Sequence, residues 1–235
     1  MSAGMPWSSS KAIRQDAAPA PPVVISVPSM SKRIASRSEA DCRASLVGRP
    51  RARDRQHHAM AKPLRDVIAP DLAVLFCGIN PSLLSAERGH HFARPGNRFW
   101  PAIHRAGLTP RRLAPSEDED LLRFGLGVTN LVDRPTRSAA ELSREELRAG
   151  AQALTALVAA NRPRVLAVLG ITAWRTSWER PGATAGRQPE RLGHTAIWVL
   201  PNPSGLNAHH QLADLAAAYR EMGRAAGLPL WSDSP

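Results

Sequence analysis

The chain has 235 residues, of which 43% are apolar and 22% are charged, and its formal net charge at pH 7 is +11. This length can bury one ordinary core, and no apolar run approaches the roughly 18 to 20 residues of a membrane helix, which predicts a soluble protein without a membrane partner. The N-terminus lacks the apolar segment of a signal peptide, so export is not expected. Only two cysteines occur, Cys42 and Cys77, which excludes a disulfide framework and a four-cysteine iron–sulfur site and fits a reducing cytoplasm.

The positive charge is unevenly distributed along the chain. Residues 1–66 hold 12 Lys and Arg against 5 Asp and Glu, a net +7, whereas the rest of the chain carries only +4. Such a basic balance predicts a polyanionic partner, although much of the charge lies in the N-terminal part. A gene composition that favours arginine is the alternative explanation.

Residues 1–64 are rich in Ser, Pro, Ala and Arg and show no sustained helix or strand period, which predicts a disordered leader. Three explanations remain open for it. It is a basic arm that tethers DNA, a targeting peptide, or upstream sequence translated because the start was assigned too early, with Met60 as the true start. The last is favoured slightly. Residues 65–228 are expected to form the folded domain, followed by a short tail at 229–235.

Four nearly continuous apolar runs predict buried strands in an α/β fold whose sheet is covered on both faces. They span residues 72–79, 127–132, 164–170 and 195–200. A helix is predicted within 97–107, where Pro101 falls in the first turn. A longer one begins after Ser143, whose pairing with Glu146 has the spacing of a capping box, and ends before Pro163. The last helix is predicted over 212–227, with an apolar stripe formed by Leu212, Leu215, Tyr219 and Met222.

The first and last predicted strands each end in an Asn-Pro turn. Asn80 and Pro81 follow the first strand, and Asn202 and Pro203 follow the last. Either turn alone indicates a loop and no more. In a parallel sheet, however, both turns would face one cleft at the carboxyl ends of the strands, where α/β proteins bind ligands.

Four segments together resemble the mismatch-specific uracil/thymine DNA glycosylase family of the uracil-DNA glycosylase superfamily. They are GINPSLLSA, HHFARPGNRFW, GVTNLVDRPT and LPNPSGLN, in this order, and the resemblance covers about residues 64–226. It implies a three-layer α/β/α sandwich with a short, mainly parallel sheet of four or five strands. It further implies a monomer that needs no cofactor or metal, acts on double-stranded DNA with G:U or G:T mismatches, and is cytoplasmic, associated with the nucleoid when on DNA.

The resemblance assigns catalysis and base binding to the first loop. Asn80 matches the catalytic Asn, whose amide can orient a water molecule but cannot take its proton at neutral pH. Phe92 matches the ring that stacks on the extruded base. The main chain around Ile79 and Phe92 is expected to contact the edge of the uracil, and His91 to adjoin the base. Ser82 stands where the family usually has glycine, which places thymine acceptance in doubt.

The second loop is assigned to the duplex. Leu206 matches the apolar wedge that fills the gap left by the flipped nucleotide. Gly205 matches a position whose main chain contacts the unpaired guanine, while Asn202, Ser204 and Asn207 complete this group of DNA contacts. Phosphate contacts are expected from Ser85 and Arg98, and also from Arg94 and Arg187, although Arg187 fits a solvated surface equally well.

Some features leave alternatives open. Asn130 stands where some family members have Lys, and the Asp133–Arg134 pair is interpreted as structural. A metal site formed by the histidines near residues 90 and 209 lacks a suitable ligand spacing. No lysine lies in the matched motifs, which predicts a glycosylase without strand cleavage. Rival hypotheses are a lesion-binding protein without activity and, less well supported, a hydrolase that uses Ser204 with His209 or His210.

Overall fold

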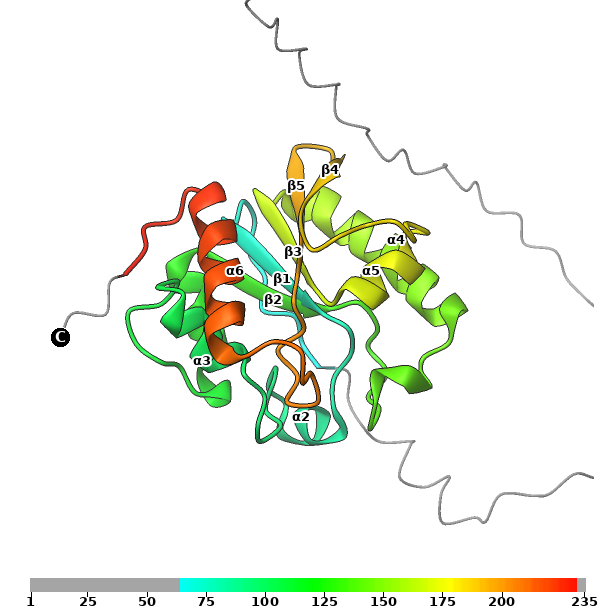
Figure 1. The fold of residues 1–235 in the computed structure, drawn as a ribbon, viewed down its shortest axis with the longest axis horizontal. Helices are drawn as coiled ribbons and strands as arrows, with labels where there is room; N and C mark the ends of the chain where they lie inside the picture. The colour runs from blue at the N-terminus through cyan, green and yellow to red at the C-terminus, as the bar shows by residue number, and fades with distance from the viewer. Residues whose placement is uncertain (1–63, 232–235) are drawn as a thin grey trace, which may run out of the picture.

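A five-stranded sheet lies at the centre of the computed structural model, which describes residues 64–231 (Figure 1). Its strand order is β2-β1-β3-β5-β4, and all neighbours are parallel except the β4–β5 pair. The strands are β1 (Val74–Gly78), β2 (Leu126–Asn130), β3 (Val165–Leu169), β4 (Gly186–Leu192) and β5 (Thr195–Leu200). The expectations for residues 1–63 and for the last four residues lie outside the described residues.

Helices cover both faces of the sheet, which confirms the predicted three-layer sandwich (Figure 1). Side chains alternate along β1, so that Val74 and Phe76 enter one core while Leu75 and Cys77 enter the other. Helices α3 (Phe99–Arg105) and α6 (Leu212–Ala225) bury their apolar sides in the first core. Helices α4 (Arg144–Asn161) and α5 (Ile171–Ser177) pack against the second.

Helix α4 begins and ends where the sequence predicts. The Ser143 hydroxyl accepts a hydrogen bond from the Glu146 backbone N–H, and the Glu146 carboxylate accepts one from the Ser143 backbone N–H. This reciprocal pair is the predicted capping box. Arg162 has a left-handed backbone (φ 50°) just before Pro163, and the helix ends there. Buried Ala151 and Leu154 lie on its inner face.

Strand β4 was not among the strands located in the sequence. It contains Pro189 and four charged or amide side chains, a composition poor in strand-forming residues. It lies at the edge of the sheet, where a proline is tolerated because one side of the strand needs no ladder hydrogen bond. Its antiparallel register with β5 shifts between Arg187 and Arg191, the segment that contains the proline.

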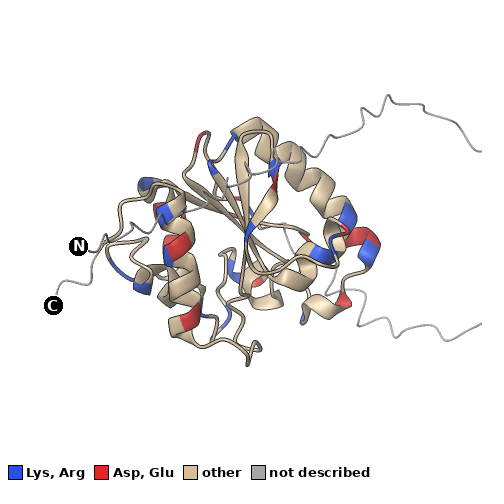
Figure 2. Cartoon of the chain, turned by 45° about the horizontal axis from the view of Figure 1, so that its top comes forward, with Lys and Arg blue, Asp and Glu red and all other residues tan. Residues whose placement is uncertain are grey.

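Of the remaining short elements, one follows β1, one leads into the amino end of β2 and one follows β2. They are α2 (Leu83–Arg88) and two 3-10 helices, η1 (Pro115–Phe124) and η2 (Ala139–Glu141). The segment between β5 and α6 approaches α2 at the same end of the molecule (Figure 1). Charged side chains lie mostly on helices and loops around the sheet (Figure 2). Within residues 64–231, no helix is long and apolar enough to span a bilayer.

Candidate active site

A cleft of about 340 Å³ opens at the carboxyl ends of the parallel strands. It brings together ten of the residues that the sequence singled out, from segments that are far apart in the chain. They are Ile79, Asn80, Ser82, Ser85, His91, Phe92, Asn202, Ser204, Leu206 and Asn207. Gly205 and Arg98 lie beside this cleft but do not line it, and no carboxylate is among the described residues that do.

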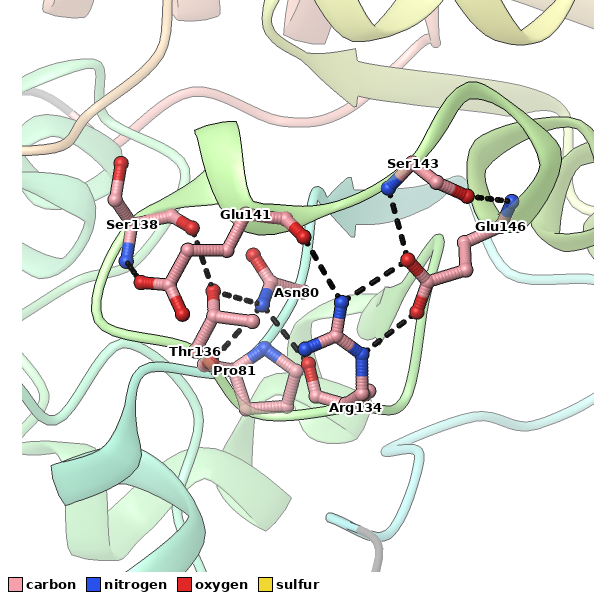
Figure 3. Close-up of polar contacts among 8 residues, drawn as sticks. All are labelled: Asn80, Pro81, Arg134, Thr136, Ser138, Glu141, Ser143 and Glu146. Atoms are coloured by element: carbon pink, nitrogen blue, oxygen red, sulfur yellow. Dashed lines mark hydrogen bonds and ion pairs between the residues drawn. The ribbon is translucent and has the colours of Figure 1, made fainter. Parts of the chain in front are cut away.

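The Asn80 side chain is held in one orientation. Its Nδ2 lies 2.9 Å from the Arg134 carbonyl oxygen and 2.7 Å from the Thr136 hydroxyl oxygen (Figure 3). The Thr136 hydroxyl donates its own proton to the Ser138 carbonyl, so it accepts from Asn80. Both Asn80 amide protons are therefore used. Oδ1 is the polar atom that remains for a ligand or water in the cleft.

Phe92 forms an aromatic wall of the cleft. Its ring stacks on Phe99 with the centroids 4.1 Å apart, and its backbone is left-handed (φ 53°). A non-glycine residue in this conformation is uncommon and costs roughly 1 kcal/mol or more, which points to a functional constraint. Gly78, at the end of β1, makes room for this wall. A Cβ at Gly78 would lie 3.4 Å from the Phe92 ring and 2.6 Å from Asn130 Oδ1.

The His91 ring is more enclosed than the sequence indicated, since the residue is only 1% exposed. Its Nε2 lies 2.9 Å from the Arg65 carbonyl oxygen, which can only accept, so Nε2 carries the proton. Burial lowers the pKa of His91 below its usual value, which keeps the ring neutral. Nδ1 is then an acceptor, 3.5 Å from Asn130 Nδ2.

This burial makes a pH effect on stability testable. Unfolded His91 takes up a proton as the pH falls through about 6.5, whereas the folded ring resists protonation until a lower pH. The free energy of unfolding should therefore fall as the pH drops below about 6.5. His91→Gln keeps a donor for the Arg65 carbonyl and should lose less stability over this interval. Urea denaturation at pH 7.5 and 5.5 measures the difference, and equal losses in both proteins would contradict it.

Asn130 belongs to the site, although the sequence marked it only as a departure from a family pattern. It ends β2 and pairs in register with Gly78, which places its amide at the cleft between His91 and Phe92. The position of Asn130 in the sequence could have predicted this, because a polar residue at the end of an apolar parallel strand lies at the same sheet edge as Asn80. Thr136 also lines the cleft and was not assigned a role there.

The loop at residues 202–207 is braced internally and presents Leu206 to solvent. The Asn202 side chain accepts from the Ser204 N–H at 2.9 Å, and the Asn207 side chain donates to the Asn202 carbonyl at 2.9 Å. The Leu206 side chain is 69% exposed. A single exposed leucine is common on protein surfaces, so the position of Leu206 at the cleft, on a braced loop, is what marks it as a candidate contact residue.

Arg98 has a different position from the one expected of a phosphate contact. Its guanidinium donates to three carbonyl oxygens of the second loop, those of Ser204, Asn207 and His210. The Arg98 backbone N–H also donates to the Pro203 carbonyl. Arg98 thus fixes the loop that carries Leu206, and the phosphate contact expected of it stays a prediction.

Gly205 and Ser85 also receive structural explanations that the sequence did not supply. A Cβ at Gly205 would lie 2.7 Å from the Gly96 carbonyl oxygen, so a glycine is needed where the two loops meet. Ser85 is buried, and its hydroxyl accepts from the Ala93 N–H at 3.1 Å. It joins α2 to the Phe92 segment, and the phosphate contact expected of it stays a prediction. Ser82 caps α2 by accepting from the Ser85 N–H.

The other chemical alternatives can be compared with this geometry. The Ser204 hydroxyl accepts from the Leu206 N–H, and no hydrogen bond joins it to His209 or His210 within the described residues. His90 contacts a different residue: its Nδ1 lies 3.3 Å from Asp118 Oδ1. No group of three His, Cys, Asp or Glu side chains in residues 64–231 could hold a metal ion. The arrangement favours a reaction in which an amide oxygen orients water beside an aromatic wall.

Two comparisons show what known proteins the chain is similar to. A family model described as the uracil DNA glycosylase superfamily matches residues 65–223, well over half of the chain. A protein from Methanosarcina acetivorans, named as a candidate uracil DNA glycosylase and solved by solution NMR, is 19% identical with a TM-score of 0.49. That match covers 69% of this chain and 98% of the other.

Proposed function

The chain belongs to the uracil DNA glycosylase superfamily, whose members act on DNA, and we propose that it hydrolyses the N-glycosidic bond of uracil paired with guanine. Thymine and exocyclic cytosine adducts opposite guanine are further candidate substrates. The reaction flips the nucleotide out of the duplex and leaves an abasic site without cutting the strand. A lesion-binding protein without activity is the alternative, and the fixed amide of Asn80 favours the enzyme.

The orientation of Asn80 carries this proposal. Its Oδ1 accepts a hydrogen bond from a water molecule, which turns a lone pair of that water toward C1′ of the flipped sugar. The bond between C1′ and the base nitrogen breaks with both electrons leaving on the base, and the water oxygen bonds to C1′. The water then gives up its proton to solvent or the departing base. Since no carboxylate is among the described residues that line the cleft, only good leaving groups such as uracil should be released at a useful rate.

Base recognition is proposed for the walls of the same cleft. The Phe92 ring stacks on the uracil, a contact worth about 1–3 kcal/mol. The Ile79 carbonyl accepts from the Val132 N–H and keeps a second lone pair, so a main-chain contact from Ile79 to the base remains open. The Asn130 amide is placed to contact the edge of the base. Its Nδ2 faces the unprotonated Nδ1 of His91, which favours one orientation of the amide.

Release without strand cleavage gives the direct test of the proposed reaction. A U·G duplex treated with the protein should yield free uracil and a strand that breaks only after alkali. Borohydride present during the reaction should trap no covalent adduct, because no lysine is among the described residues that line the cleft and could attack the sugar. Trapped protein–DNA adduct would overturn the assignment of simple hydrolysis. Tight U·G binding without free uracil would leave the lesion-binding alternative.

A second cleft of about 420 Å³ adjoins the first and carries cationic side chains. Arg88, Arg94 and Arg112 line it, and none of them forms an ion pair within residues 64–231. The two clefts meet at Phe92, Arg94 and Asn97. We expect DNA phosphates to lie along this cationic side.

Changing one of these arginines should alter the salt dependence of DNA binding. If Arg94→Gln or Arg112→Gln removes one phosphate contact, the slope of log K against log salt should become shallower by about 0.9. Fluorescence anisotropy with one duplex at several salt concentrations measures this slope. Arg187→Gln is the matched control, because Arg187 is exposed on β4 and lines neither cleft. An unchanged slope in both cleft variants would contradict the expected path.

A further inference from the structure

We infer that the Arg134–Glu146 ion pair is a positioning device that fixes the catalytic orientation of Asn80. This inference rests on the proposed function, since it concerns how Asn80 comes to orient water. Neither side chain was expected to affect the reaction, and Arg134 was interpreted as structural. Neither Arg134 nor Glu146 lines the cleft. Both act through the segment between β2 and η2, whose backbone contacts the Asn80 amide (Figure 3).

The ion pair holds the Arg134 side chain at two points. Nε donates to Glu146 Oε1 at 2.6 Å, and Nη2 donates to Glu146 Oε2 at 3.0 Å. Nη2 also donates to the Glu141 carbonyl at 3.0 Å. A two-point contact between guanidinium and carboxylate fixes direction as well as distance. The backbone of Arg134 is therefore tied to the start of α4 and to η2.

Glu146 is itself fixed before it meets the arginine. As the third residue of α4, it accepts from the Ser143 N–H at 2.8 Å in the capping box. The hydrogen bond from Arg134, followed by that from the Ser143 backbone, lowers the pKa of Glu146 to about 2. The carboxylate is thus ionised over the whole pH range in which a DNA repair enzyme would work. The start of α4, an 18-residue helix whose inner face packs on the sheet, is a rigid base for the pair.

The segment held by this pair supplies the two closest acceptors of Asn80 Nδ2, and the third is the Pro81 carbonyl at 3.3 Å. The Arg134 carbonyl takes one amide proton and the Thr136 hydroxyl takes the other. The Thr136 N–H donates to the Pro81 carbonyl, which fastens the same segment to the Asn-Pro turn. If the Arg134 carbonyl shifts, the amide can rotate and Oδ1 loses its fixed direction. A misplacement of about 1 Å can reduce a rate roughly 10²-fold.

The test compares variants that release the segment with variants that only weaken α4. Glu146→Ala and Arg134→Ala remove the pair. Ser143→Ala is one control, because it removes the hydroxyl cap and leaves the pair in place. Arg148→Ala is the other, because it breaks an ion pair of the same helix, with Glu179 at 2.7 Å, that involves none of the residues in contact with Asn80. All are assayed for single-turnover uracil release from U·G at saturating enzyme, for duplex affinity and for melting temperature.

We expect Glu146→Ala and Arg134→Ala to slow release about 10- to 100-fold while the duplex Kd changes less than about twofold. The release rate of Glu146→Gln should lie between the rates of these two variants and that of wild type, because the glutamine amide oxygen can still accept one hydrogen bond from Arg134. Ser143→Ala should lower the melting temperature as Glu146→Ala does, yet release uracil at the wild-type rate. In ¹H–¹⁵N NMR spectra, the Asn80 side-chain signals should move in Glu146→Ala and not in Ser143→Ala.

Two results would overturn the inference. One is a wild-type rate in both Glu146→Ala and Arg134→Ala, and the other is an equal loss of rate in Ser143→Ala. A failure of the proposed function is distinguishable from either, because it shows in the wild-type protein as absent uracil release. The Asn80 amide signals would then still report whether the ion pair fixes this side chain.

Discussion

Asn80→Ala is expected to reduce single-turnover release of uracil from a U·G duplex by roughly 10²-fold or more, while the Kd for the duplex stays within about twofold. The side chain that disappears contributes the amide oxygen that orients water, and no carboxylate is among the described residues that line the cleft and could take over this role. Rapid-quench sampling at saturating enzyme separates this effect from binding. A variant that keeps the wild-type rate would show that Asn80 does not act on the water.

Asn80→Asp tests the same assignment more finely. A carboxylate that acts as a general base is typically worth 10²- to 10⁴-fold in rate. Here, however, one of its oxygens would face the Arg134 carbonyl. In the wild type this carbonyl oxygen accepts one of the Nδ2 protons, with an N–O distance of 2.9 Å. Two acceptors repel each other, so we expect the aspartate to be displaced and the variant to be slower than wild type at pH 7. If Asn80→Asp were faster than wild type, the hydrogen bonds donated by the Asn80 amide would not be required for the reaction.

Leu206→Ala has the second largest expected effect. Burial of a leucine side chain is worth about 1.5–3 kcal/mol, and alanine retains only part of it, which corresponds to roughly a 10- to 100-fold loss of release from a U·G duplex. The loss should be greater on U·A, where the nucleotide is harder to extrude. Single-stranded substrate should be released at a rate within about twofold of wild type, because it leaves no gap for a wedge.

A matched control separates the wedge from a general loss of exposed apolar surface. Leu122→Ala removes another exposed leucine, which lies in η1 and lines neither cleft. It should leave all rates unchanged. If Leu206→Ala slowed uracil release equally from duplex and from single strand, Leu206 would act in folding or in the chemical step and not as a wedge. If Leu206→Ala released uracil from the duplex at the wild-type rate, Leu206 would have no role in base flipping.

Much of the fold was predictable from local patterns because the central strands are buried on both faces. Continuous apolar runs located β1, β2, β3 and β5 to within two residues at either end. The capping box located the start of α4. Edge strand β4 was not predicted, because its pairing with β5, and not its own composition, makes it a strand. Helix α5 has only seven residues, too few to show a helical period.

The site was predictable where a backbone motif carries it and less so where distant side chains meet. The two Asn-Pro turns pointed to one cleft because parallel strands share an edge. The contacts of Arg98 with the Ser204 and Asn207 carbonyls join segments more than 100 residues apart, which no local pattern reveals. The same holds for Asn80, whose orientation depends on Arg134 and Thr136. Fixing the direction of a side chain requires the tertiary structure.

The central claim is that uracil is removed in preference when it lies opposite guanine. Single-turnover base release by the wild-type protein should be compared on four substrates of one sequence: U·G, U·A and T·G duplexes and single-stranded U. We expect release from U·G to be well above release from U·A, because the mispaired base is less costly to extrude and the Leu206 loop can contact the unpaired guanine. Equal rates for U·G and U·A would contradict guanine-directed excision, and binding to U·G without release from any substrate would contradict the glycosylase itself.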